Sequence, residues 1–158
     1  THIWAAGDVD GGMRFTHTAH YEGALAGRNS FSKNPSRVDE RVVPRATFVD
    51  PEVASVGYTE AQVREKYGKA LVGVFNMRGL GRGYIDGNTV GLVKIVGDPK
   101  TRKVLGGHVI GERAGELVHE IALAMYLKGK VDDLAEMIHA YPTYSEAVTG
   151  AASMAEVS

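Results

Sequence analysis

Two short stretches of the chain carry side chains suited to chemistry. The first is Gly7-Asp8, which directly follows the apolar residues 3–6. Such an apolar run predicts a buried strand, and ligands of open α/β sheets bind just beyond the carboxyl ends of strands. A carboxylate at Asp8 could therefore accept hydrogen bonds from the hydroxyl groups of a sugar or ribityl chain, or it could cap a turn.

The second stretch is residues 139–146, which read HAYPTYSE. Its Tyr141 carries a phenol, which titrates near about 10 and is a poor base but a good hydrogen-bond donor at neutral pH. Glu146 could accept a hydrogen bond from that phenol. His139 follows a predicted helix over residues 131–138, and a histidine is favourable beside the C-terminus of a helix.

Other residues give weaker indications. The run GLGRG at residues 79–83 could bind phosphate, but no helix start follows it, so a glycine-rich hairpin connection is the better interpretation. Two sets of residues could mimic metal ligands on one helical face: His17 with His20, and His119 with Glu116 or Glu120. Neither set has a third ligand at suitable spacing, so we expect no metal site.

The composition is that of a globular domain. The chain has 158 residues, of which 44% are hydrophobic and 23% charged, with a formal net charge of -1. This balance gives no electrostatic case for nucleic acid or an anionic membrane as a partner, and no apolar run approaches the ~18 residues needed to span a membrane. The absence of cysteine is compatible with the cytoplasm, where we expect the protein to lie.

The chain begins inside an apolar run rather than with Met, so we expect a fragment of a longer protein. A helix is predicted over residues 16–29. Polar residues with Pro35 follow it, and they predict a linker. The expected organisation is a first segment over residues 1–30, a linker over 31–41 and a domain over 42–158.

That domain begins with strands and ends with helices. Strands are predicted over residues 46–49, 53–56, 71–75, 91–96 and 103–110, with a loop over 79–88. Helices are predicted over residues 59–67, 116–127, 131–138 and 145–157. This order indicates an α+β fold, an antiparallel sheet with helices packed on one side.

Two groups of motifs resemble one known family. The pattern TxxWAAGD at residues 1–8, followed by FTHxA at 15–19, is similar to the second FAD fingerprint of the class I pyridine nucleotide-disulfide oxidoreductases. The resemblance implies that residues 1–30 are the strand-helix remnant of an FAD-binding domain. It also implies that Gly7 and Asp8 contact the ribityl chain, and that Phe15 and Thr16 lie nearest the flavin pyrimidine edge.

The longer match is to the same family's dimerisation domain. It comprises VPRATFVDPEVASVGYTE at residues 43–60, GLVKI at 91–95, GGHVIG at 106–111 and AGELV at 114–118. The resemblance implies a homodimer and a parent enzyme that uses FAD and NAD(P)H. Because the other cofactor-binding parts would lie upstream, we expect this fragment alone to retain no FAD and to be inactive.

One position departs from the family's pattern. Disulfide-reducing members have His-Pro-x-x-x-Glu, in which the His is the acid–base group in the partner subunit's active site, but Tyr141 stands at that position here. Mercuric reductases resemble this arrangement but end in a cysteine pair, which this chain lacks. The resemblance therefore implies an acceptor other than a simple disulfide, such as a metal ion or a quinone.

Several alternatives remain open. Glu146 is retained, and His139 could assume the base role by a backbone shift or could be structural. The chain could be a homodimerisation module without chemistry of its own, or a stand-alone binding protein without a flavin, because fold alone does not settle function.

Overall fold

The computed structural model describes residues 2–158, which form two compact units. The first unit ends at Glu40, and the second is Arg41–Ser158. The boundary between them lies at the C-terminal end of the segment predicted as a linker. No helix among the described residues is long and apolar enough to cross a membrane.

The first unit contains the 3-10 helix η1 (Gly7–Asp10) and the helix α1 (Thr16–Ser30). The strand predicted over residues 3–6 is wrong: this stretch is irregular, and Ile3 is 75% exposed. A strand is stable only when its backbone groups pair with a neighbour, and no other strand forms in the described part of this unit to pair with it.

Residues 31–40 fold back along α1. The Asn29 side chain donates to the carbonyl of Ser36 at 2.8 Å and accepts from its N–H at 2.9 Å. Near the end of the segment, the N–H of Asp39 donates to the hydroxyl of Tyr21 at 3.1 Å. The segment predicted as a linker is therefore held by side chains of the helix that precedes it.

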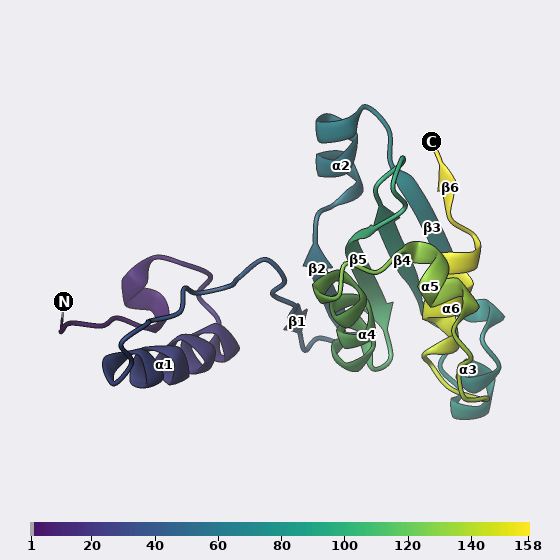
Figure 1. The fold of residues 1–158 in the computed structure, drawn as a ribbon. Helices are drawn as coiled ribbons and strands as arrows, with labels where there is room; N and C mark the ends of the chain where they lie inside the picture. The colour runs from purple at the N-terminus through teal and green to yellow at the C-terminus, as the bar shows by residue number, and fades with distance from the viewer. Residues whose placement is uncertain (1) are drawn as a thin grey trace. The chain divides into compact units, whose positions relative to one another are not determined.

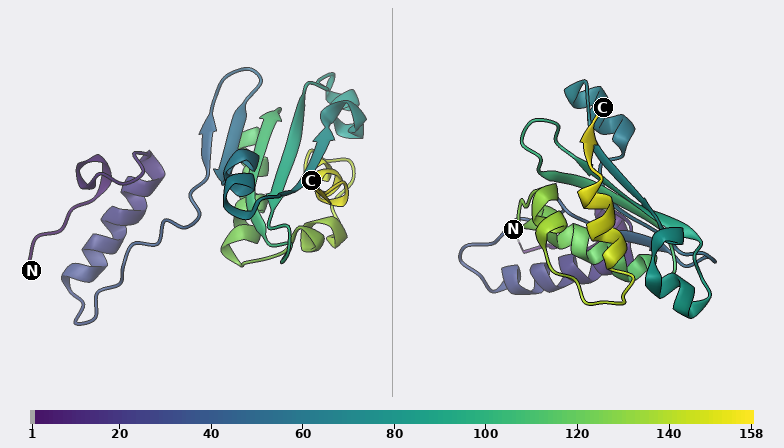
Figure 2. Two further views of the ribbon diagram at one scale, coloured as in Figure 1. Left: turned by 90° about the horizontal axis from the view of Figure 1, so that it is seen from above. Right: turned by 90° about the vertical axis from the view of Figure 1, so that its right-hand side faces the viewer.

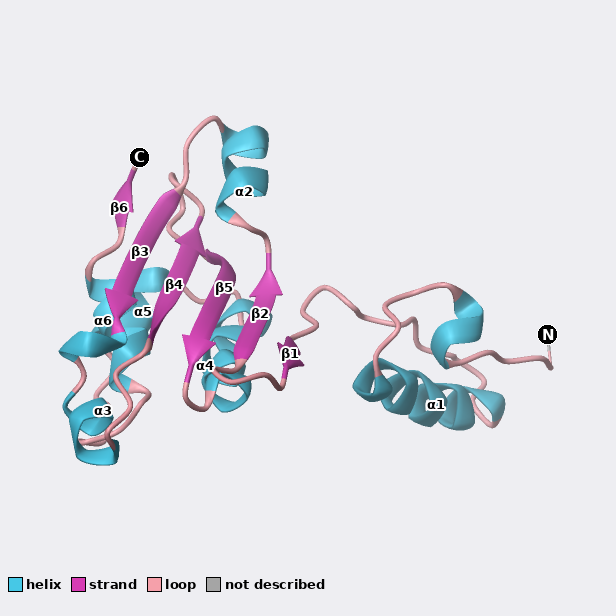
Figure 3. Ribbon diagram, turned by 180° about the vertical axis from the view of Figure 1, so that it is seen from behind, coloured by secondary structure: helices cyan, strands magenta, loops and turns pink. Residues whose placement is uncertain are grey.

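The second unit is built on an antiparallel sheet (Figures 1 and 3). Its strands are β1 (Arg45–Thr47), β2 (Val53–Gly57), β3 (Leu71–Asn76), β4 (Gly91–Gly97), β5 (Val104–Gly111) and β6 (Glu156–Val157). Their order across the sheet is β1-β2-β5-β4-β3-β6, and every neighbouring pair is antiparallel. The prediction of an α+β fold with an antiparallel sheet is confirmed.

Helices cover one face of the sheet, as Figure 2 shows from two further directions. They are α4 (Ala114–Tyr126), α5 (Val131–Glu136) and α6 (Glu146–Ser153). Here α4 packs on β5 and β2, and α6 packs on β3 and β4. The helix α2 (Glu60–Tyr67) differs, because its Val63 packs with Val96 and Val72 in a separate small cluster.

Close approach of these helices requires glycine in the strands. A Cβ on Gly107 of β5 would lie 2.6 Å from the Ile121 side chain of α4. A Cβ on Gly73 of β3 would lie 1.9 Å from the carbonyl oxygen of Ala151 in α6. The strands therefore lack side chains where each helix axis comes nearest to the sheet.

Several predicted bounds need correction, among them the strand predicted over residues 46–49, which ends at Thr47 as β1. The predicted loop over residues 79–88 contains the short helix α3 (Gly81–Asp86), preceded by the 3-10 helix η2 (Met77–Gly79). The predicted helix over residues 131–138 ends at Glu136, because Met137 is extended. The predicted helix over residues 145–157 ends at Ser153, because the chain then pairs with the free edge of β3 as β6.

Candidate functional site

The segment between α5 and α6 brings the three predicted catalytic side chains to one pocket. His139, Tyr141 and Glu146 line a cavity of about 590 Å³, together with Phe75, Leu80, Thr149 and glycines 79, 81 and 150. The cavity is therefore lined by two aromatic rings and glycine backbone together with a carboxylate, a hydroxyl and an imidazole.

Tyr141 is the exposed member of this group, with 79% of its surface accessible. Its hydroxyl faces Gly81, where a Cβ would lie 3.4 Å from the phenol oxygen. The glycine-rich run at residues 79–83 thus forms part of the wall beside Tyr141, and the hairpin interpretation of that run is replaced by η2 and α3.

Glu146 is the first residue of α6, and its carboxylate binds its own segment. The N–H of Thr143 donates to Glu146 Oε2 at 2.9 Å, and the Thr143 hydroxyl donates to the carbonyl of Ala140 at 2.7 Å. Among residues 2–158, no hydrogen bond joins Tyr141 to Glu146. The carboxylate therefore shapes the turn that carries Tyr141.

His139 is the buried member, with a side chain that is 6% exposed. Its Nε2 lies 2.7 Å from Glu120 Oε1 of α4, and its Nδ1 lies 3.0 Å from the carbonyl oxygen of Met137. The Thr149 hydroxyl of α6 lies 2.5 Å from Nδ1. His139 therefore stands beyond the end of α5, with both ring nitrogens engaged, and it is not free to reach a substrate.

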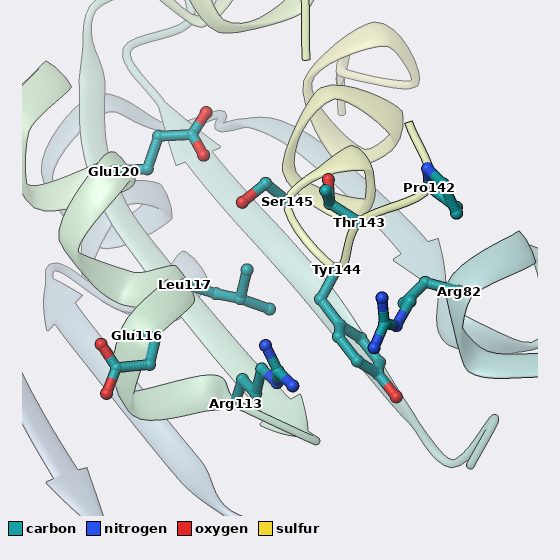
Figure 4. A pocket seen from close by; sticks show the side chains of 9 residues that line it. All are labelled: Arg82, Arg113, Glu116, Leu117, Glu120, Pro142, Thr143, Tyr144 and Ser145. Atoms are coloured by element: carbon teal, nitrogen blue, oxygen red, sulfur yellow. The ribbon is translucent and has the colours of Figure 1, made fainter. Parts of the chain in front are cut away.

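A second hollow of about 300 Å³ lies between α4 and residues 142–145 (Figure 4). The Tyr144 ring at its end is 4% exposed, and its hydroxyl has no hydrogen-bond partner among the described residues. The Arg113 guanidinium lies 5.6 Å from the centre of that ring. Burial, followed by the nearby Asp86 carboxylate, raises the pKa of Tyr144.

Arg82 also lines this hollow and forms an ion pair with Asp86, with Arg82 Nε and Asp86 Oδ2 2.8 Å apart. Hydrogen bonding to Arg82 lowers the pKa of Asp86. Sequence reasoning missed both arginines, because Arg82, Arg113 and Tyr144 come from three separate segments and no spacing pattern links them.

The predicted FAD residues lie in the first unit. Gly7 is buried, and its N–H donates to Glu22 Oε2 at 2.5 Å. Its φ of +78° and a distance of 3.2 Å from its would-be Cβ to Ala19 Cβ both favour glycine. Asp8 follows in η1 and is exposed.

Phe15 and Thr16 flank the N-terminus of α1. Thr16 is the first residue of the helix, and the Phe15 ring stacks on His17 at 5.2 Å between ring centroids. The side chain of Phe15, the residue before the helix, accepts no hydrogen bond from the backbone N–H groups of the first turn. The helix therefore presents N–H groups at its positive end, next to an aromatic ring.

No group of three histidine or acidic side chains among residues 2–158 is placed to hold a metal ion. His119 is exposed on α4, whereas Glu120 is hydrogen-bonded to His139. The histidines at positions 17 and 20 both lie on α1.

The comparisons with known proteins agree with one another. Residues 43–152 match the sequence model of the family described as "Pyridine nucleotide-disulphide oxidoreductase, dimerisation domain". The mercuric reductase of Bacillus cereus is 40% identical over 144 residues, covering 91% of this chain and 23% of its own. The dihydrolipoyl dehydrogenase of Bacillus subtilis is 36% identical over 156 residues, covering 99% of this chain and 33% of its own.

Solved structures show the same relationship. LpdA from Mycobacterium tuberculosis superposes with a TM-score of 0.86 at 30% identity, covering 96% of this chain and 33% of its own. The HOCl-induced flavoprotein disulfide reductase RclA from Escherichia coli superposes with a TM-score of 0.87 at 27% identity, covering 96% of this chain and 35% of its own. The chain thus spans about a quarter to a third of the length of the relatives it matches.

Proposed function

Because this chain belongs to the pyridine nucleotide-disulphide oxidoreductase family as its dimerisation domain, we propose that it is the assembling part of an FAD-dependent enzyme that oxidises NADH or NADPH. The family uses FAD and NAD(P)H, and its dimerisation domain forms homodimers. We further propose that the enzyme works in the cytoplasm, without nucleic acid or membrane as a partner.

An apolar face supports the homodimer. Leu123 of α4 and Leu127, its C-cap residue, are exposed and lie three and seven residues after Glu120, so all three lie on one side of the helix. The hydrogen bond between His139 and Glu120 holds the segment after α5 beside α4, and Ile138 of that segment is 96% exposed. Large apolar side chains gathered on one face are typical of an interface.

The exposed Tyr141 at the pocket supports an acceptor other than a simple disulfide. A phenol can donate a hydrogen bond or a proton to an acceptor but is a poor base at neutral pH. His139 has both ring nitrogens bound to neighbours, which argues against its replacing the missing base. In this proposal Tyr141 meets the acceptor, and Glu146 holds the turn that presents it.

The first unit has groups whose chemistry fits part of a flavin. FAD, when bound, supplies the site that accepts hydride from NAD(P)H. The uncapped N–H groups at Thr16 suit the carbonyl oxygens of its pyrimidine edge, and the exposed Asp8 carboxylate suits ribityl hydroxyls. Gly7 allows the backbone to turn there, because its φ is +78°. Contacts with only these two parts of the flavin are too few to hold FAD, so the chain alone is expected to lose it.

A second candidate is a homodimerisation module without chemistry. It is favoured by the separate core of Arg41–Ser158, which carries the apolar face and contains none of the predicted FAD residues. An FAD-binding glycine motif upstream in the complete protein would decide against it.

Light scattering at several protein concentrations tests the assembly role, and the absorbance of bound flavin tests cofactor retention. We expect a persistent dimer without flavin colour and without NAD(P)H oxidation. A monomer at every concentration would contradict the homodimer, and a yellow preparation that oxidises NAD(P)H would contradict the claim that the fragment is inactive.

The acceptor is tested in the complete protein with Tyr141→His and Tyr141→Phe. We expect the native protein to reduce a quinone or metal-ion acceptor faster than a small disulfide. Tyr141→His should raise the rate of disulfide reduction, and Tyr141→Phe should lower the rate with the quinone or metal-ion acceptor. Rapid disulfide reduction that is unchanged in Tyr141→Phe would overturn the proposal.

A further inference from the structure

We infer that His139 is a positioning residue, which fastens the segment carrying Tyr141 to two separate helices. The role of Tyr141 rests on the proposed function. The fastening itself rests on the contacts of the imidazole and can be tested without flavin, acceptor or partner enzyme.

The imidazole joins its own segment to the helices α4 and α6. Its Nε2 donates to the Glu120 carboxylate of α4 at 2.7 Å, and its Nδ1 meets the Thr149 hydroxyl of α6 at 2.5 Å. The Met137 carbonyl of the segment itself lies 3.0 Å from Nδ1. The His139 side chain is only 6% exposed, and its contacts with Glu120 and Thr149 are partly buried, which limits competition from water.

A histidine suits this place because its two ring nitrogens project in different directions from one rigid ring. While Nε2–H donates to Glu120, a neutral Nδ1 can accept from the Thr149 hydroxyl, and a protonated Nδ1 can donate to the Met137 carbonyl. The ring therefore keeps its bond to Glu120 in either state. A glutamine could replace one of these bonds, and an alanine could replace none.

The other end of the segment is fastened as well. Thr143 bonds to Ala140 and Glu146, so Tyr141 lies between two held points. The Tyr141 side chain is itself 79% exposed, and few contacts of its own orient it. Its direction toward Gly81 therefore depends on the backbone that His139 and Thr143 hold.

The test compares His139→Ala and His139→Gln with the native chain, with His119→Ala as the matched control. His119 lies on the same helix as Glu120 and is exposed. The readouts are the NMR signals of selectively labelled tyrosine rings and the hydrogen exchange of the nearby Thr143 amide, which donates to Glu146. We expect His139→Ala to speed that exchange at least about tenfold and to average the Tyr141 ring signals. His139→Gln should restore part of the native behaviour, and His119→Ala should behave like the native chain.

The inference is overturned if His139→Ala leaves the exchange of the Thr143 amide and the ring signals of Tyr141 equal to those of His119→Ala. If His139→Ala fails to fold, His139→Gln and Glu120→Gln decide with the same readouts, because each keeps part of the network. A monomeric chain or rapid disulfide reduction would count against the proposed function and would leave this result unchanged.

Discussion

The backbone N–H of Thr143 donates a hydrogen bond to the carboxylate of Glu146 at 2.9 Å, across the turn that begins α6. This bond satisfies the N–H of Thr143, which lies before the helix and has no partner within it. We expect Glu146→Ala to lower the free energy of unfolding by about 1 kcal/mol, while Glu146→Gln, which keeps an acceptor, costs less. Urea unfolding of both variants measures these free energies. Equal losses of unfolding free energy would show that the hydrogen-bond acceptor at position 146 is unimportant.

Ile138 should be central to the homodimer. Replacing this exposed side chain by Asp places a charge in the apolar face and should shift the chain toward monomer. Phe31→Asp is the matched control, because Phe31 is 95% exposed but belongs to the first unit. Light scattering reports the mass of each variant. A dimer that survives Ile138→Asp unweakened would place the interface elsewhere.

Gly107 sets how closely α4 approaches the sheet. A methyl group there would lie 2.6 Å from Ile121, so Gly107→Ala should lower the free energy of unfolding by about 1–3 kcal/mol. Gly23→Ala provides the contrast, because nothing lies within 4 Å of its would-be Cβ in α1, and it should stabilise that helix by up to about 1 kcal/mol. Denaturant unfolding and hydrogen exchange of α1, respectively, measure the two effects.

Glu40 should make the first unit less stable at neutral pH. Partial burial, then the Glu22 and Asp10 carboxylates, raise the pKa of Glu40 above its ordinary 4.5. Because the folded state then binds more protons, the contribution of Glu40 to stability is fully present below the ordinary value and is lost as pH rises through the raised one.

Glu40→Gln removes this dependence, so the α1 amides should exchange more slowly than in the native chain at neutral pH. Glu65→Gln, an exposed change in the second unit, should leave them unaltered. A native α1 that grows more protected as pH rises from the ordinary pKa of Glu40 toward neutrality, after correction for intrinsic exchange, would show that the sign is wrong.

Local rules were enough to predict much of the second unit. Thr59 caps α2 by accepting from the N–H of Gln62 at 3.3 Å, and Gly68 ends the helix with a φ of +79°. These contacts lie within a few residues of one another, so residue type and spacing alone indicate them. Alternating apolar positions likewise indicate the strands and, with their order, the α+β class.

The features that only the tertiary structure determined depend on partners that are distant in sequence. Residues 3–6 have strand composition, but no strand forms beside them in the described part of the first unit, whereas residues 156–157 form β6 because an edge of β3 is free to pair. The same holds for the site, where His139 meets Glu120 and Thr149 only because α4 and α6 pack on one face of the sheet. Motifs indicate which residues are chemically suited to a site, whereas the packing of helices on the sheet determines which of them meet.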